Sequence, residues 1–182
     1  MRRPDRFRLI RICTRAHPEG ERIANVDFSQ LFPRLAYQLC KREAPQGDLY
    51  DILDDGLSRD GFKKLVNSML FAQGAVLRWP RETSMLFAKR TKLRDVVTLI
   101  RDAHAPIAHQ FGSGIGFRLM FIESGILIEA LQTLFARGIT ALPLHDSVLV
   151  AASEAGATEE VMKEAFERVT KESGGKLKVD FG

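Results

Sequence analysis

The chain has 182 residues, of which 45% are apolar, and a formal net charge of +4. This length and composition suit one soluble domain with its own core, or a core with one lobe attached. Cys13 and Cys40 lie far apart and outside any CxxC pattern, so we expect two free, at least partly buried thiols rather than a disulfide framework or a zinc site. Apolar runs are shorter than a membrane span and the start does not resemble a signal peptide, so we expect a cytoplasmic protein without membrane contact.

Positive charge is concentrated at the N-terminus. Residues 1–26 contain seven arginines and three acidic residues, so this stretch alone has a net charge of +4. Guanidinium groups match phosphate oxygens in geometry, and a basic arm over residues 1–21 is therefore typical of a protein with a nucleic-acid partner. A solvated terminus would explain the same charge.

The first half of the chain predicts one strand and two helices. Residues 22–27 predict a short strand that ends on Asp27, and Ser29 is a plausible N-cap for a helix that runs to about residue 41. Residues 44–56 predict mostly loop. Ser58 is expected to cap a second helix, and Gly74 and Pro80 interrupt the pattern after it.

The second half predicts helices over residues 89–109 and 117–136, followed by a hairpin. The hairpin consists of two apolar runs, residues 139–144 and 148–151, with His145, Asp146 and Ser147 between them. Thr158 opens a further amphipathic helix, and residues 176–181 alternate like a final strand. Strands and helices in this order indicate an α+β domain.

Two acidic residues occupy unusual positions. Asp27 ends an apolar strand, and Asp146 lies at the tip of an apolar hairpin. If the two elements are neighbours in one sheet, their carboxylates converge and repel each other unless a cation lies between them. Carboxylate oxygens select Mg²⁺ or Mn²⁺, which can hold phosphate groups for an in-line phosphoryl displacement. A plain turn aspartate is the competing interpretation of Asp146.

The helix after Ser58 has a cationic and aromatic face. Arg59, Lys63, Asn67 and Phe71 follow one another at a spacing of four residues, so each is a neighbour of the next on the helix surface. Two cations followed by an amide and an aromatic ring suit the phosphates and the base of a nucleotide. The competing interpretation is an amphipathic helix with a solvated basic edge and Phe71 in the core.

These residues lie in motifs that resemble those of the family A (DNA polymerase I-like) polymerases. Residues 27–34, DFSQLFPR, are similar to the first catalytic motif of that family, DYSQIELR. Arg59, Lys63 and Phe71 have the spacing of its fingers helix, and residues 144–147, LHDS, resemble its VHDE hairpin. Shorter matches are found, in the family's order, at residues 48–50 (DLY, for DxH), 122–125 (IESG, for IQGT) and 178–180 (KVD, for the last palm strand).

The resemblance implies a role for each matching residue. Asp27 and Asp146 would be catalytic and, with the backbone of Phe28, would hold Mg²⁺ or Mn²⁺. Arg34, His145 and Ser147 would contact a primer-template nucleic acid. The residues expected to bind the nucleoside triphosphate are Arg59, Lys63, Asn67, Phe71 and Phe32, and Lys63 is also a candidate catalytic proton donor to the pyrophosphate.

The sequence departs from the family at four of these positions. Phe32 replaces a glutamate, Asn67 replaces an aromatic residue, and Phe71 lacks the hydroxyl of the family's tyrosine. Ser147 also replaces a glutamate, and His-Asp-Ser is the form found in the single-subunit phage-type RNA polymerases. DNA synthesis is favoured, but a single-subunit RNA polymerase, a primase-like enzyme and a catalytically idle nucleic-acid-binding module remain alternatives. A metal-dependent nuclease would leave the face of Arg59 to Phe71 unexplained.

The resemblance implies an α+β fold with a palm-type antiparallel sheet, packed helices, a small helical fingers lobe and no thumb. The expected segments are a basic arm (1–21), a first palm segment (22–57), a fingers-like lobe (58–116) and a second palm segment (117–182). An accessory protein or another subunit is expected to supply the missing grip on the duplex.

Overall fold

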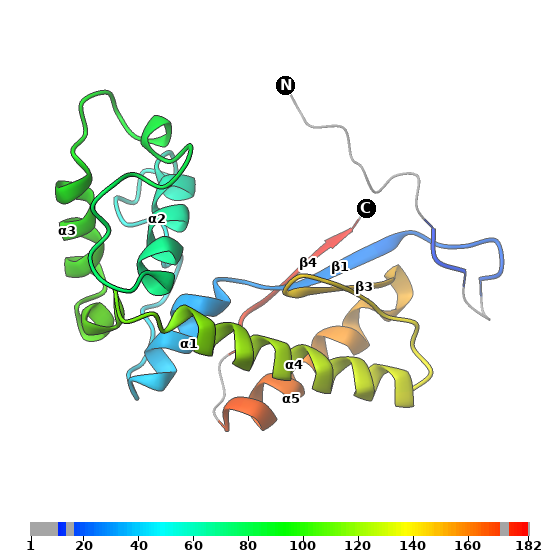
Figure 1. Cartoon of the computed structure of the whole chain (residues 1–182). Coiled ribbons are helices and arrows are strands. Elements are labelled where there is room, and N and C mark those ends of the chain that lie inside the picture. The colour runs from blue at the N-terminus through cyan, green and yellow to red at the C-terminus, as the bar shows by residue number, and fades with distance from the viewer. Residues whose placement is uncertain (1–10, 14–16, 172–174, 182) are drawn as a thin grey trace. The chain divides into compact units, whose positions relative to one another are not determined.

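The computed structural model describes residues 11–13, 17–171 and 175–181. Most of the predicted basic arm, residues 1–10 and 14–16, lies outside the described residues. The chain forms two compact units (Figure 1): one comprises the chain up to Ser29 and from Ile122 onward, and the other comprises Gln30–Phe121. We name them the sheet unit and the helical unit. These two units are defined by contacts within the chain, whereas the expected arm, palm and fingers segments are defined by function. The division into arm, palm and fingers therefore stays a prediction.

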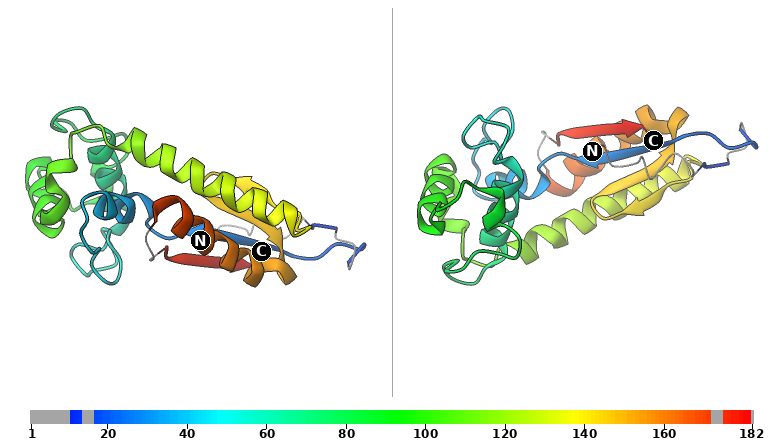
Figure 2. Two further views of the ribbon diagram at one scale, coloured as in Figure 1. Left: turned by 90° about the horizontal axis from the view of Figure 1, so that it is seen from below. Right: turned by 90° about the horizontal axis from the view of Figure 1, so that it is seen from above.

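The sheet unit contains a four-stranded antiparallel sheet with the order β2-β3-β1-β4. Its strands are β1 (Ile23–Phe28), β2 (Leu142–Leu144), β3 (Ser147–Ala151) and β4 (Leu177–Phe181). Helix α5 (Ala155–Thr170), which follows the short 3₁₀ turn η3 (Ala152–Glu154), and the part of α4 (Gly116–Ala136) from Ile122 onward cover one face of the sheet (Figure 2). The predicted α+β class with an antiparallel sheet is confirmed.

Alternation along β1 sets which side chains point away from helix α5. Ala24, Val26 and Phe28 are buried, and the Phe28 ring lies 5.8 Å from the ring of Phe166 on α5. Successive side chains of a strand point to opposite faces, so Asp27 projects from the face that α5 does not cover. The apolar run thus buries one face of β1 and leaves its final acid on the other.

Helices α4 and α5 pack through apolar and charged contacts. Ile126, Ala130 and Leu134 are fully buried, and they recur on α4 at the spacing of one helix face. Arg168 on α5 lies 2.9 Å from a carboxylate oxygen of Glu129 on α4. The apolar stripe of α4 is thus buried, and the ion pair links α4 to α5 at the surface.

By length and composition alone, α4 is also long and apolar enough to cross a membrane, with 22% of the relevant window buried. The expectation that no segment approaches a membrane span is corrected here. Arg118, Glu123 and Glu129 interrupt the apolar run in the sequence, but the mean hydropathy of the window still reaches 1.5. A core helix of a soluble protein meets the same criterion.

The helical unit is built from α1 (Leu31–Leu39), α2 (Arg59–Phe71) and α3 (Leu93–Ala103), with the 3₁₀ segments η1 (Ser84–Leu86) and η2 (Ala105–Gln110). Each helix has an apolar side that faces the interior of the unit. Large and fully buried side chains of this core are Tyr37, Phe62, Leu65, Leu70, Ile100 and Ile107.

Several boundaries differ from those predicted. The first helix begins at Leu31 with Gln30, in a left-handed conformation (φ 60°), at the N-cap in place of Ser29. The pattern over residues 89–109 divides into α3 and η2, because Pro106 lies at the start of η2 and cannot continue an α-helix. Helix α5 begins before Thr158, at Ala155. Both cysteines are free, as expected, but Cys13 is exposed.

A buried polar chain ties three segments of the helical unit together. The hydroxyl of Tyr37 and Nδ1 of His104 lie 3.0 Å apart, and Nε2 of His104 lies 3.0 Å from the carbonyl oxygen of Leu49. A carbonyl only accepts, so Nε2–H donates to Leu49, and Nδ1 then accepts from the Tyr37 hydroxyl. Burial lowers the pKa of His104 from its ordinary value of 6.5, although the hydrogen bond to Leu49 opposes this effect. His104 is therefore neutral in the folded protein.

Replacing Tyr37 with Phe is expected to lower the free energy of unfolding by about 1 kcal/mol, because Nδ1 of His104 loses its buried donor. In the wild type, stability should fall as the pH drops below the ordinary histidine value, since the unfolded chain then takes up a proton at His104 that the folded chain does not. Urea unfolding followed by circular dichroism at neutral and mildly acidic pH measures both effects. Equal stability of Tyr37→Phe and wild type would contradict the assigned hydrogen bond.

Candidate functional site

Asp27 and Asp146 come from neighbouring strands of the sheet. Strand β1 pairs with β3 so that Asp27 lies opposite Ser147, the first residue of β3. Asp146 directly precedes Ser147 and, with His145, forms the turn of the β2–β3 hairpin. Both acids are half-buried. The strand of Asp27 and the hairpin of Asp146 are neighbours in one sheet, which is the condition that convergence of their carboxylates required. The predicted three-residue turn is corrected to two residues.

A third carboxylate, that of Glu123 on α4, shares this environment. It is half-buried, and its pKa is raised to about 7 by burial and by the negative charges of Asp146 and Asp27. An ordinary glutamate titrates near 4.5, so burial and the two neighbouring acids together disfavour the ionised form of Glu123. We call Asp27, Glu123 and Asp146 the acid cluster.

The sequence interpretation missed Glu123 as a member of this cluster. Its position nevertheless has a signal, since Glu123 precedes the buried residues Ile126, Ala130 and Leu134 by three, seven and eleven residues. These spacings place all four residues on one face of α4. An acid on the buried face of a helix indicates that nearby charges or a bound cation interact with it. The sequence motif alone did not indicate such an interaction.

The acid cluster fits a hard divalent cation in its donor type. Carboxylate oxygens are the ligands that Mg²⁺ takes from proteins, commonly from only one or two residues, with water and phosphate completing its shell. Across the described residues, no three His, Cys, Asp or Glu side chains are grouped so that they could hold a metal ion. The candidate ligands are Asp27 and Asp146. Burial is the main cause of the raised pKa of Glu123, and the negative charges of these two acids add to it; a cation would offset those charges.

The remaining predicted residues of the sheet unit are Phe28, His145 and Ser147. The Phe28 side chain is buried against Phe166, and its backbone lies opposite Leu177 in the sheet. His145 is exposed in the hairpin turn with a positive φ of 55°. Ser147 is only 4% exposed, and its hydroxyl donates to the carbonyl of Leu144 at 2.8 Å. Metal binding by the Phe28 backbone and nucleic-acid contact by His145 and Ser147 stay predictions.

In the helical unit, α2 carries the predicted nucleotide-binding face. Lys63 is exposed, whereas Arg59, Asn67 and Phe71 are half-buried. The opposite side of the helix is buried, at Gly61, Phe62, Leu65, Val66, Met69 and Leu70. The amphipathic pattern thus leaves the polar face at the surface of this unit.

Aromatic rings gather at the C-terminal end of α2. The ring centroid of Phe71 lies 5.6 Å from that of Phe32 and 5.7 Å from that of Phe117, both edge-on. A β-carbon at Gly116 would lie 2.5 Å from the Phe71 ring, so this ring packs directly on the backbone at the start of α4. The structure brings the rings of Phe32 and Phe71 together and gives Phe71 a packing role, and their assignment to a nucleotide pocket stays a prediction.

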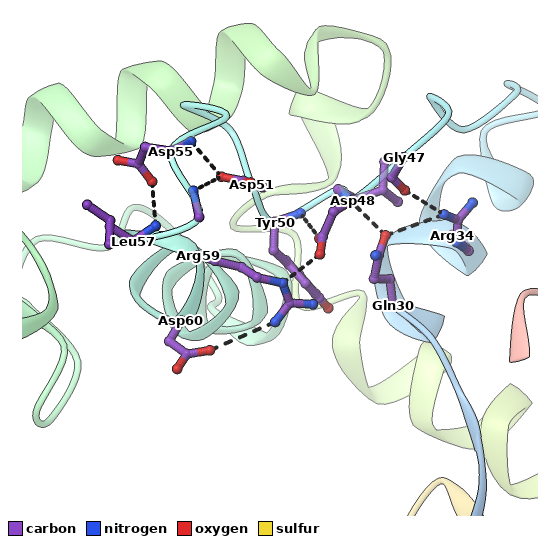
Figure 3. Close-up of polar contacts among 12 residues, drawn as sticks. Gln30, Arg34, Gly47, Asp48, Tyr50, Asp51, Asp55, Leu57, Arg59 and Asp60 are labelled. Atoms are coloured by element: carbon purple, nitrogen blue, oxygen red, sulfur yellow. Dashed lines mark hydrogen bonds and ion pairs between the residues drawn. The ribbon is translucent and has the colours of Figure 1, made fainter. Parts of the chain in front are cut away.

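Polar contacts surround Arg59 at the other end of this face (Figure 3). Its Nε donates to a carboxylate oxygen of Asp48 at 2.5 Å, and its guanidinium carbon lies 5.7 Å from the ring centroid of Tyr50. The Tyr50 hydroxyl donates to Oδ1 of Asn67 at 3.3 Å. The sequence interpretation did not anticipate that Asp48 would pair with Arg59.

Arg34 lies beside this network on α1. It donates to Gln30 Oε1 at 3.4 Å and to the carbonyl of Gly47 at 3.2 Å. Burial lowers the pKa of Arg34, while the charges of Asp48 and Tyr50 act in the opposite direction. These contacts give Arg34 a structural role in the helical unit, and its predicted contact with nucleic acid stays a prediction.

No protein-family profile and no curated protein matches the sequence. Among the solved structures that it matches is the POL domain of Pol1 from M. smegmatis in complex with DNA primer-template and dNTP. The two chains share 14% identity and a TM-score of 0.44, over 88% of this chain and 39% of that chain. The chain therefore spans less than half of the polymerase domain, and the similarity is a distant one of fold.

Proposed function

We propose that the chain catalyses template-directed nucleotidyl transfer, with Asp27 and Asp146 as the metal-binding acids. The observation that carries the proposal is the sheet register, in which Asp27 lies opposite the residue that follows Asp146. The raised pKa of Glu123 supports it, because its causes include the charges of both acids. Neighbouring acids repel one another and lower the stability of the fold. Their presence together therefore favours a functional role.

Mg²⁺ or Mn²⁺ held by Asp27 and Asp146 would supply Lewis-acid stabilisation of phosphate oxygens and would favour an ionised attacking hydroxyl. The protein itself contributes the fixed positions of the carboxylates. The hairpin turn holds Asp146 close to the pair formed by Asp27 and Ser147, and the hydroxyl of Ser147 secures that turn through its bond to Leu144.

The α2 face would bind the nucleoside triphosphate. Lys63 and Arg59 carry the cationic groups that match phosphate oxygens, and Lys63 would donate a proton to the departing pyrophosphate. The rings of Phe71 and Phe32 offer apolar contact to the sugar or the base. In the sequence motif Phe32 replaces the family's glutamate; we propose a deoxyribonucleotide as the first substrate and treat a ribonucleotide as the alternative.

Primer extension by the purified full chain tests the proposal. A labelled primer on a DNA or an RNA template is incubated with dNTPs or NTPs in Mg²⁺ or Mn²⁺, and products are resolved by length. We expect template-dependent extension in at least one divalent cation and none in a chelator. Extension with NTPs but not with dNTPs would favour the RNA polymerase or primase alternative. Absence of extension, together with binding of primer-template, would favour the idle nucleic-acid-binding module.

A further inference from the structure

Arg59 is enclosed by partners of the helical unit rather than extended into solvent (Figure 3). Asp48 accepts from its Nε at 2.5 Å, the ring centroid of Tyr50 lies 5.7 Å from its guanidinium carbon, and Asp60 lies 3.8 Å from its Nη1. The side chains of Arg59 and Asp48 are 36% and 32% exposed, whereas that of Asp60 is 79% exposed. Asp48 is therefore the close and partly shielded partner, and Asp60 is a solvated one.

Asp48 is held in position by its own segment. Its second carboxylate oxygen accepts from the backbone N–H of Tyr50 at 2.9 Å. The backbone on either side is anchored as well, since the N–H of Leu49 donates to Gln30 at 2.9 Å and Arg34 donates to the carbonyl of Gly47 at 3.2 Å. The contact between Asp48 and Arg59 therefore depends on the ordered backbone around Asp48 and not only on the two side chains.

A carboxylate and a phosphate compete for the same donors of a guanidinium group. Both accept from the planar fork of arginine, and a carboxylate already on one edge withholds that edge from a phosphate. Its negative charge also repels an approaching polyphosphate, and partial burial screens this repulsion less than full exposure would. The ring of Tyr50 supports the guanidinium plane independently of Asp48.

We propose that Asp48 is an internal competitor for phosphate on Arg59 and thereby sets the affinity of the α2 face for polyphosphates. The inference rests on the proposed role of Arg59 in binding the triphosphate. Lys63, exposed one turn further along α2, supplies the second cation for the same ligand. A triphosphate binds at this face by displacing the Asp48 carboxylate from Nε of Arg59.

Binding of sodium tripolyphosphate to the full chain, measured by isothermal titration calorimetry at low ionic strength, tests the inference without template or turnover. Asp48→Asn is expected to lower the dissociation constant about three- to fivefold, because an amide can still accept from the Tyr50 N–H but no longer carries the competing charge. The matched control is Asp60→Asn, an acid on the same arginine but well exposed, with an expected change below about twofold. Circular dichroism verifies that each variant folds.

A double-mutant comparison assigns the gain to Arg59. Arg59→Gln is expected to weaken tripolyphosphate binding. Asp48→Asn should increase the affinity less in the Arg59→Gln background than in the wild-type background. Weaker or unchanged binding by both Asp48→Asn and Asp48→Ser would overturn the proposal, since Asp48 would then position Arg59 or have no influence on it. Tighter binding by Asp48→Asn without any primer extension by the wild type would leave the inference standing and would remove the proposed function.

Discussion

Replacing Asp146 with Asn is expected to reduce the rate of primer extension by about three orders of magnitude, corresponding to a loss of about 4 kcal/mol of transition-state stabilisation. The amide retains the size of the side chain but not the charge that would hold a divalent cation. Asp146 lies in a two-residue turn, so the paired residues of the hairpin on either side keep their contacts. Asp27→Asn is expected to have an effect of the same order, because Asp27 is the other proposed ligand.

The control for this prediction is an acid of the same sheet outside the acid cluster. Asp180 lies on β4 opposite Asn25, and its carboxylate is 2.6 Å from Nζ of Lys178. Asp180→Asn should change extension by less than about twofold, since exposed ion pairs contribute little. Electron paramagnetic resonance of bound Mn²⁺ gives a second readout that does not require turnover. Retention of both Mn²⁺ binding and extension by Asp146→Asn would refute the metal assignment.

Replacing Glu123 with Gln is expected to stabilise the protein above neutral pH in the absence of divalent cations. The folded-state pKa of Glu123 is about 7, above its ordinary value of 4.5, so its contribution to stability is complete at acidic pH and is lost as the pH rises through 7. The full shift would correspond to about 3 kcal/mol, but the group is only half-buried and solvent screens its charge. We therefore expect a gain of about 1–2 kcal/mol, or roughly 3–6 °C in melting temperature.

Thermal unfolding from acidic to mildly alkaline pH, with and without Mg²⁺, measures this effect. The advantage of Glu123→Gln should grow between the two pKa values and level off above 7. Mg²⁺ should reduce the difference in stability between Glu123→Gln and the wild type, because a bound cation offsets the repulsion between the acids of the wild type. Glu129→Gln on the same helix is the control; it loses the ion pair with Arg168 and should be slightly destabilised at neutral pH. A destabilised Glu123→Gln above neutral pH would contradict the shared environment of the three acids.

Much of the local structure follows from the sequence, because helices and strands repeat a fixed backbone geometry. The four-residue spacing from Arg59 to Phe71 does produce one helix with those residues on its less buried side. The apolar runs around His145 and Asp146 do form a hairpin. Periodicity could not locate the helix start at Leu31, which depends on the left-handed conformation of Gln30.

The composition of the candidate site was predicted only in part. The motifs identified the two acids and the residues of the α2 face. Glu123 and Asp48, the partner of Arg59, lie in the shorter matches at residues 122–125 and 48–50, but neither of them was assigned a role from the sequence. Glu123 is 96 residues after Asp27, and Asp48 is 11 residues before Arg59. Neither relation is a repeat of a helix or a strand, so neither is visible in a periodic pattern.

The sequence by itself determined the α+β class, the positions of most helices and strands, and the alternation that leaves Asp27 on one face of β1. Each depends on side-chain spacing along a regular backbone. Only the tertiary structure decided which charges share a neighbourhood. Sheet order sets Asp27 beside the hairpin of Asp146, helix packing adds Glu123, and an anchored segment brings Asp48 to Arg59. Electrostatic interaction depends on distance through space, and that distance is fixed when separate segments pack together.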